Sequence, residues 1–262
     1  MKSLSHTSLA CAAAAFGLLV AGGCAPDSES PEVNYEANDR VYGEIAIAGE
    51  NLVRSVSMAG PVTLEGEDTD VVRWYVYRYT SAPTQAEANA ALQQVVPVYT
   101  KAGNTMVFDV TVPSSDGVTY HGAITLGVPS ALACDVRNAQ APVRASNLSN
   151  DLTVQGSDSL TVLQHSGSVD VALSSGHILI EAAIPPSGSC TATTQSGDIE
   201  LRLVPGTSAT LVARALQGTV TVSGLELADR IDRTGFVSGT LGGGSAPIYL
   251  ETRSGNITVK GL

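Results

Sequence analysis

The sequence predicts an all-β protein, and three observations lead to that fold class. The chain has 262 residues, of which 44% are hydrophobic but only 5% aromatic, so its apolar content is mainly small and aliphatic. It also has 26 Gly, and Gly, Val, Thr and Ser are mediocre helix formers. Third, a Gly-led alternating pattern returns along the chain. We therefore expect a repeat of short strands.

The repeat unit is Gly, any residue, an aliphatic residue, any residue, and a second aliphatic residue. Because it alternates, each copy predicts a strand with two side chains in the core and one outside. A ninth copy begins at Asn150 in place of Gly. Asn is the residue next most tolerant of positive φ, so we interpret the first position as a left-handed turn residue. The eight Gly-led copies begin at Gly43, Gly60, Gly122, Gly167, Gly176, Gly197, Gly218 and Gly255.

The spacing of the copies favours a parallel β-solenoid. Gly176, Gly197 and Gly218 are separated by 21 and 21 residues, which we interpret as one coil with two or more strands. A β-sandwich is the alternative, since its strands also recur every 8–12 residues. We favour the solenoid because sandwich strands rarely repeat one pattern so closely.

Residues 1–23 are typical of a lipoprotein signal peptide. A basic start is followed by a short apolar stretch and then by small residues. The apolar stretch is too short for a comfortable membrane span. The segment Ala21-Gly-Gly-Cys24 resembles the bacterial lipobox, although Ala21 stands where Leu is usual. The resemblance implies that Cys24 is diacylated and becomes the mature N-terminus, which would anchor the chain stably. An ordinary secretory signal cut near Ala21 is the alternative. Ala25 resembles the outer-membrane sorting pattern.

The next two segments are predicted to differ from the repeat. Residues 24–40 are rich in Pro, Ser and acidic residues, so we expect a disordered tether. Residues 41–128 contain Gly-led strands and one helical segment within 81–94, and they could cap the solenoid. For that helix, Thr84 and Glu87 fit a capping box, and Pro97 should stop it.

The segment Val71–Tyr79 predicts a candidate ligand surface. Alternation places Val72, Trp74 and Val76 on one face of the strand and Arg73 and three tyrosines on the other. These tyrosines could stack on sugar rings or dock a partner. The alternative is cross-strand packing under the helix. The three tyrosines are Tyr75, Tyr77 and Tyr79.

Residues 129–262 form the predicted β-strand-repeat solenoid and contain two cysteines. In an exported chain Cys134 and Cys190 could form a disulfide. They could equally be small buried apolar residues. Each follows a proline by five positions, so they resemble equivalent places in separate repeat units. If those units are not adjacent, the cysteines cannot be bridged.

Several segments resemble one bacterial family. Ser196-Gly-Asp-Ile-Glu-Leu201, His165–Val171, Val128-Pro-Ser130 and Thr252–Val259 are similar to the bacterial putative-adhesin β-strand-repeat family, a domain of unknown function. The resemblance covers about residues 40–262. It implies a right-handed β-solenoid and supplies no catalytic residues.

No motif for catalysis, cofactors or nucleic acid is found. The net charge is −11 with no basic cluster, so nucleic acid is not an expected partner. His121, His165 and His177 lack metal-ligand spacing, and the last two are expected to be solvated. Outward carboxylates at residues 170, 198 and 200 could act as in a glycosidase, but solvated turn residues are the better interpretation. We expect no metal, no cofactor and no enzyme activity.

These features predict a lipid-anchored lipoprotein of the bacterial cell envelope, exposed at the surface or in the periplasm and placed at the outer membrane. Its body would be a non-catalytic, adhesion-like binding module for a glycan or an envelope protein. A structural scaffold that docks another envelope protein is the alternative, and a polysaccharide-active enzyme is a third hypothesis that no acid/base cluster supports.

Overall fold

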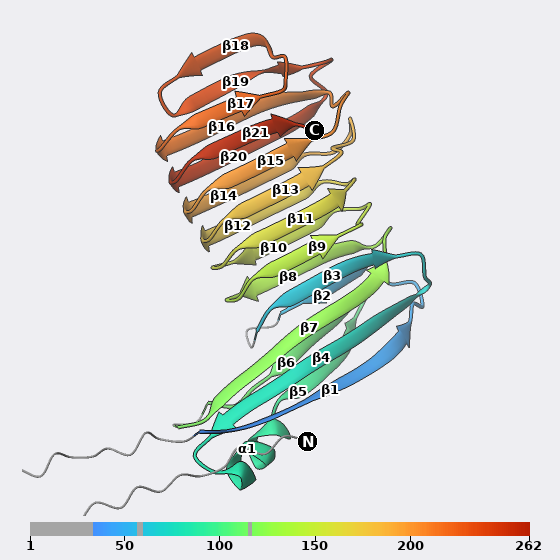
Figure 1. Cartoon of the computed structure of the whole chain (residues 1–262). Helices are drawn as coiled ribbons and strands as arrows, with labels where there is room; N and C mark the ends of the chain where they lie inside the picture. The colour runs from blue at the N-terminus through green and yellow to red at the C-terminus, as the bar shows by residue number, and fades with distance from the viewer. Residues whose placement is uncertain (1–33, 57–59, 115–116) are drawn as a thin grey trace, which may run out of the picture. The chain divides into compact units, whose positions relative to one another are not determined.

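The computed structural model describes residues 34–56, 60–114 and 117–262, and it confirms the all-β class. Its strands form a 10-stranded and an 11-stranded sheet. Figure 1 shows the strands stacked as successive coils. None of the helices among these residues is long and apolar enough to cross a membrane. The described residues all belong to one compact unit.

A coil consists of one strand in the 11-stranded sheet followed by one strand in the 10-stranded sheet. Neighbouring strands of successive coils pair in parallel, as a solenoid requires. The eight coils among the described residues are β2 (Leu52–Ser55) with β3 (Val62–Glu67), β6 (Thr105–Thr111) with β7 (Thr119–Pro129), β8 (Ala133–Ala139) with β9 (Val143–Ser146), β10 (Leu152–Gly156) with β11 (Leu160–His165), β12 (Val169–Ser175) with β13 (Ile178–Ala182), β14 (Cys190–Ser196) with β15 (Ile199–Leu203), β16 (Ala209–Gln217) with β17 (Val220–Ser223), and β20 (Ala246–Ser254) with β21 (Ile257–Gly261).

The spatial order of the coils departs from the sequence order at both ends. The coil β2–β3 lies between β6–β7 and β8–β9, and the final coil β20–β21 lies between β14–β15 and β16–β17. Gly197 and Gly218 therefore belong to coils that are not neighbours, although their spacing equals that of Gly176 and Gly197. The 21-residue spacing describes one coil but not the order of the coils.

The sheets are mixed, so the expectation of a purely parallel solenoid is wrong. At one end β1 (Tyr35–Ala46) pairs antiparallel with β4 (Val71–Ala82), β4 with β7, and β5 (Val96–Ala102) with β6. At the other end β18 (Ala228–Arg233) and β19 (Phe236–Leu241) form a hairpin on β16. The two sheets face each other as in a sandwich, but successive coils alternate between them, which is solenoid-like.

The core lies between the sheets and consists of stacked aliphatic pairs. Each strand of a central coil contributes at least the two alternate inward side chains that the sequence pattern predicts, and several strands contribute a third. The narrow interior leaves little room for rings. The inward pairs of the 10-stranded sheet include Leu160 and Val162, Ile178 and Ile180, Ile199 and Leu201, and Ile257 and Val259; those of the other sheet include Leu152 and Val154, Val169 and Val171, Cys190 and Ala192, and Ile248 and Leu250.

The repeated glycines permit close contact between coils. A β-carbon on Gly197 would lie far inside van der Waals contact with the carbonyl oxygen of Gly176, and one on Gly255 would meet the carbonyl of Gly197. The left-handed interpretation fits Gly176, whose φ is 96°. It is wrong for Asn150, which is not among the positive-φ residues; its side chain instead donates to the carbonyl of Ala131 at 2.8 Å.

The helix α1 (Gln85–Leu92) has the predicted cap. Its N-cap residue is Thr84, whose hydroxyl accepts a hydrogen bond from the amide of Glu87 at 3.2 Å. Pro97 does not stop the helix, because the helix ends at Leu92 and Pro97 lies in β5. The helix packs on Ala37 and Ala82, on the inner face of β1 and β4.

The disulfide left open by the sequence is not formed. Cys134 and Cys190 are free, buried thiols. They occupy matching positions on β8 and β14, with Leu152 and Val169 on the two strands between them. Three strand spacings amount to about 14 Å, well beyond the roughly 7 Å that a disulfide can bridge. Burial raises the pKa of each thiol to about 12.

Two of the predicted segment boundaries fall inside strands. β1 begins at Tyr35, so part of the segment 24–40 that was expected to be a tether is a paired strand. β7 runs from Thr119 to Pro129 across the boundary proposed at residue 128, because the inserted region itself contributes the coil β6–β7. The predicted signal peptide and Cys24 lie outside the described residues.

Candidate functional site

The outer face of β1, β4, β7 and β3 carries the predicted tyrosines. Along β4, Val72 and Val76 are fully buried and Trp74 packs on the core, while Tyr75, Tyr77 and Tyr79 point to the opposite face. The alternative of tyrosines packed under the helix is wrong, because α1 covers the inner face. Tyr75 is the most exposed of the three, at 38%.

The strand register brings Tyr42 beside Tyr75. Antiparallel pairing of β1 with β4 places these two residues directly opposite each other, and β7 adds Thr125 to the same row. Tyr42 is 82% exposed, which is unusual for a large ring. The next row holds Glu44, Arg73, Gly127 and Glu65 on four successive strands.

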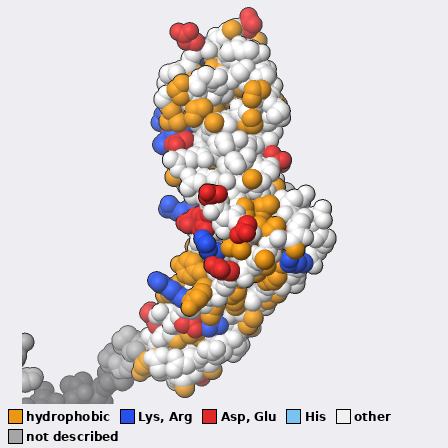
Figure 2. All heavy atoms as spheres, turned by 90° about the vertical axis from the view of Figure 1, so that its right-hand side faces the viewer, with side chains coloured by type: hydrophobic (Ala, Val, Ile, Leu, Met, Phe, Trp, Pro, Cys, Tyr) orange, Lys and Arg blue, Asp and Glu red, His pale blue; other side chains and the backbone are white. Residues whose placement is uncertain are grey.

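Two small residues on β7 create a hollow between these rows. Gly127 has no side chain and Thr125 has a short one, whereas the flanking strands carry rings and long charged chains. We call this hollow of about 270 Å³ the Tyr42–Arg73 pocket. Figure 2 shows hydrophobic, acidic and basic side chains gathered side by side over the half of the unit that holds these strands. The pocket is lined by Tyr42, Gly43, Glu44, Glu65, Glu67, Arg73, Trp74, Tyr75, Thr125 and Gly127.

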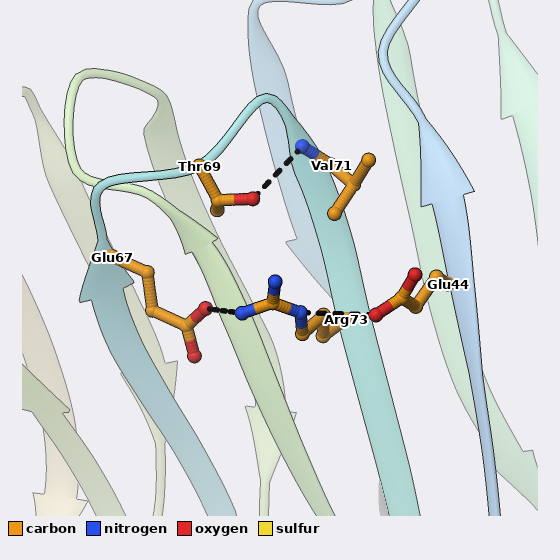
Figure 3. Close-up of polar contacts among 5 residues, drawn as sticks. All are labelled: Glu44, Glu67, Thr69, Val71 and Arg73. Carbon is orange, nitrogen blue, oxygen red and sulfur yellow. Dashed lines mark hydrogen bonds and ion pairs between the residues drawn. The ribbon is translucent and has the colours of Figure 1, made fainter.

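Arg73 is held between two carboxylates at the pocket. Its Nε donates to Glu44 at 3.0 Å, and another guanidinium nitrogen donates to Glu67 at 2.7 Å (Figure 3). These contacts, led by the hydrogen bond to Glu44, raise the pKa of Arg73 above its ordinary value. The two carboxylates therefore orient the guanidinium plane from both sides. In the turn before β4, the hydroxyl of Thr69 accepts a hydrogen bond from the amide of Val71 at 3.3 Å.

Gly127 also provides space for the Glu67 carboxylate. A β-carbon at residue 127 would collide with that carboxylate, so Gly is needed for the Arg73–Glu67 pair to form as it does. Glu65, across β7 from Arg73, has no ion pair or hydrogen bond to any described residue. The pocket thus combines two exposed rings, a fixed guanidinium, and one carboxylate free to accept hydrogen bonds. Three carboxylates against one guanidinium make it net negative.

The other two predicted tyrosines lie along β4 outside the pocket. Tyr77 pairs with Arg40 on β1, and Tyr79 pairs with Asn38. The hydroxyl of Tyr79 donates to Glu36 at 2.9 Å, and this hydrogen bond raises the pKa of Tyr79. Sequence reasoning found the tyrosine face but missed Tyr42 and the three glutamates, because their grouping depends on the register of strands far apart in the chain.

The carboxylates considered as a glycosidase pair do not come together. Asp170 points outward from β12 in the 11-stranded sheet, whereas Glu200 lies on β15 in the other sheet, so their side chains point to opposite outer faces. Glu200 is paired with Arg202 at 2.8 Å and with Lys260 at 3.0 Å. Asp198 accepts from the amide of Asn256. Glu200 and Asp198 thus serve contacts between neighbouring coils.

The histidines differ from the expectation in one respect. His177 is exposed, as expected, but His165 is 1% exposed, so the prediction that it is solvated is wrong. A register shift at the end of β11 turns His165 inward, where Nε2 lies 3.1 Å from the carbonyl of Ser168. No group of three His, Cys, Asp or Glu among the described residues could hold a metal ion.

Comparison with known proteins identifies a family. The family model described as Toastrack DUF4097 matches residues 81–260, which confirms the family resemblance seen in the sequence. No curated protein matches the chain. The chain is similar to a solved putative cell adhesion protein from Clostridium sporogenes ATCC 15579, at 8% identity and a TM-score of 0.44, covering 86% of this chain and 100% of that one. It is also similar to a putative adhesin from Bacteroides fragilis NCTC 9343, at 10% identity and a TM-score of 0.31, covering 86% and 97%.

Proposed function

The chain belongs to the Toastrack DUF4097 family, and we propose that it is a non-catalytic binding module whose Tyr42–Arg73 pocket takes a saccharide ring. The observation that carries this proposal is the pairing of two exposed tyrosine rings with a guanidinium fixed by carboxylates. The faces of a sugar ring that carry C–H groups pack on aromatic rings, while its hydroxyls need oriented donors and acceptors.

Each group of the pocket has a part in this binding. Tyr42 and Tyr75 offer apolar faces that are already exposed, so little reorganisation is required. Arg73 has remaining N–H donors beyond those given to Glu44 and Glu67, and Glu65 is an acceptor with no partner. The net negative charge disfavours uronic acids and sialic acids, because like charges repel. We therefore expect a neutral or amine-bearing saccharide.

We further propose that the body is held at the bacterial cell envelope by a lipid on Cys24, at the outer membrane. The support is the signal-like segment 1–23 and its lipobox resemblance. We retain the right-handed coil as a prediction, because parallel crossover connections are right-handed in about 98% of cases.

Titration of the full-length, detergent-solubilised protein against neutral, amine-bearing and acidic oligosaccharides tests the pocket. Tyr75→Ala and Tyr42→Ala should each weaken binding about tenfold, which corresponds to the roughly 1.4 kcal/mol of a good aromatic contact. Tyr249→Ala is the matched control, because Tyr249 is also 38% exposed but lies on the other sheet. Tyr77→Ala should have a smaller effect.

The results would also separate the alternatives. Unchanged binding in both pocket variants would remove the pocket from the proposal. A chain that binds no oligosaccharide but crosslinks in cells to one stoichiometric envelope protein would support the scaffold alternative. For the anchor, Cys24→Ala should release the protein from membranes, and a variant that still sediments with membranes would overturn the lipid anchor.

A further inference from the structure

Strand β1 is an open edge of the 10-stranded sheet. Among the described residues it pairs only with β4, and all twelve residues from Tyr35 to Ala46 pair in register without a bulge. Figure 1 shows it as the outermost strand beside β4. No described strand pairs with its other side, so the backbone N–H and C=O groups there are a template for another strand.

The other three sheet edges carry features that block strand addition. β5 contains Pro97, which lacks an N–H, and ends near Lys101, which is paired with Glu50. β17 has only four residues. β18 has a register shift and a positive φ of 50° at Asp229, and its six residues are all exposed. Such bulges, prolines and short strands protect edges. In the described chain, β1 alone is long, regular and unprotected.

The outer face of β1 is complementary to itself. Arg40, Tyr42 and Glu44 follow one another at alternate positions on this face. If a second β1 pairs antiparallel with Tyr42 opposite Tyr42, then Arg40 lies opposite Glu44 on both sides of the axis. Two ion pairs then flank a central aromatic pair, and both kinds of cross-strand pair are stabilising. Arg40 has no ion pair or hydrogen bond to any described residue. Glu44 already accepts from Arg73 through Oε1, which leaves its Oε2 to accept from the second copy's Arg40.

We propose that two copies of this chain associate through antiparallel pairing of β1 with β1, with the two-fold axis at Tyr42. A two-fold interface must be self-complementary, and this register satisfies that requirement. On the inner face, Val41 and Ile45 are only partly buried, so a second strand would cover apolar surface there as well.

This association would place two Tyr42–Arg73 pockets beside each other. Tyr42 lines the pocket in each copy, so the two sites would meet at the axis and could engage neighbouring rings of one glycan. Two linked sites raise the overall affinity without a new contact at either site. Arg40 does not line the pocket, so association and saccharide binding can be tested separately.

Disulfide trapping of the full-length protein in bacterial membranes tests the register. Tyr42→Cys should give a disulfide-linked dimer after mild oxidation, because cross-strand Cβ atoms lie about 5 Å apart. Asn38→Cys is the matched control, since Asn38 is exposed on the same face of the same strand but would face Ala46 of the second copy. The cysteines already in the chain are identical in both variants.

A charge reversal then tests the ion pairs. Arg40→Glu added to Tyr42→Cys should lower the trapped dimer at least fivefold, because residue 40 would face the partner's Glu44. Arg144→Glu, at an exposed arginine of β9 that also lacks a partner among the described residues, should leave it unchanged. Raising the salt concentration should weaken association. Equal trapping with Tyr42→Cys and Asn38→Cys, or insensitivity to Arg40→Glu, would overturn the proposal.

Discussion

The carbonyl oxygen of Gly176 occupies the space that a β-carbon on Gly197 would need. The same relationship links Gly197 with Gly255, and Gly255 with Gly218, so the glycines form a ladder across adjacent coils of the solenoid. The first position of the repeat therefore serves close approach between coils at every rung, and Gly176, Gly197 and Gly255 have a positive φ as well.

Alanine substitutions can separate these two causes. Gly218 has no positive φ, but its β-carbon would collide with the carbonyl of Gly255; Gly206 has a φ of +82° and open space around it. Gly206→Ala should cost about 1 kcal/mol for the left-handed conformation. Gly218→Ala should cost about 3 kcal/mol, because the backbone of the next coil must move. Urea unfolding measures both; a smaller loss for Gly218→Ala than for Gly206→Ala would contradict the ladder.

The buried cysteines should be unreactive in the native protein. Burial raises the pKa of Cys134 and of Cys190 to about 12, so almost no thiolate exists at pH 8. Mass spectrometry after alkylation should find both unmodified in the folded chain and both modified in guanidinium chloride without any reductant. If modification in denaturant required prior reduction, the two residues would be disulfide-bonded and the free-thiol description would fail.

The sequence predicts where the strands lie more securely than it predicts which strands pair with each other. Each Gly-led copy coincides with a strand, because alternation is a local property that a short segment carries by itself. The order of coils is different. Val220 and Val222 of β17 are chemically similar to Ile257 and Val259 of β21, so nothing local indicates which of them lies beside β15.

The sequence does not predict the Tyr42–Arg73 pocket for the same reason. Tyr42 and Tyr75 become neighbours only through the register of β1 on β4, a long-range pairing that the alternation of either strand leaves open. The buried side chain of His165 likewise depends on a register shift at the end of β11. The local pattern predicts which face of β4 holds the tyrosines. The pairing of β4 with other strands determines which residues lie beside those tyrosines.

Acid should remove the contribution of Glu50. Its carboxylate lies 2.5 Å from the Lys101 ammonium and accepts from the amide of Ala48 at 2.6 Å. The Lys101 hydrogen bond and then the Ala48 amide lower the pKa of Glu50 from 4.5 to about 2. A lowered folded-state pKa stabilises above pH 4.5, and the contribution is lost as the pH falls from about 4.5 to about 2.

Denaturant midpoints between pH 6 and pH 2 measure that contribution. Glu50→Gln should be less stable than the wild type at pH 6 and should lose less stability on acidification. Glu65→Gln is the control, because Glu65 is exposed and has no partner among the described residues, so its profile should follow the wild type. Parallel profiles for the wild type and Glu50→Gln would show that this ion pair does not stabilise the fold.

His165 should make the fold sensitive to pH near neutrality. Its Nε2–H donates to the carbonyl of Ser168 at 3.1 Å, which leaves the buried Nδ1 unprotonated and without a partner. Burial, which disfavours a charged ring, lowers the pKa of His165 below the ordinary 6.5. The unfolded chain therefore binds a proton more readily than the folded one. Stability is fully present above pH 6.5 and falls as the pH drops below it.

His165→Gln keeps an amide donor but cannot titrate, so its unfolding free energy should be nearly constant between pH 7.5 and pH 5.5, where that of the wild type falls. His177→Gln, at an exposed histidine, should retain the wild-type slope. Loss of the slope in His177→Gln, or its persistence in His165→Gln, would assign the titration to another group.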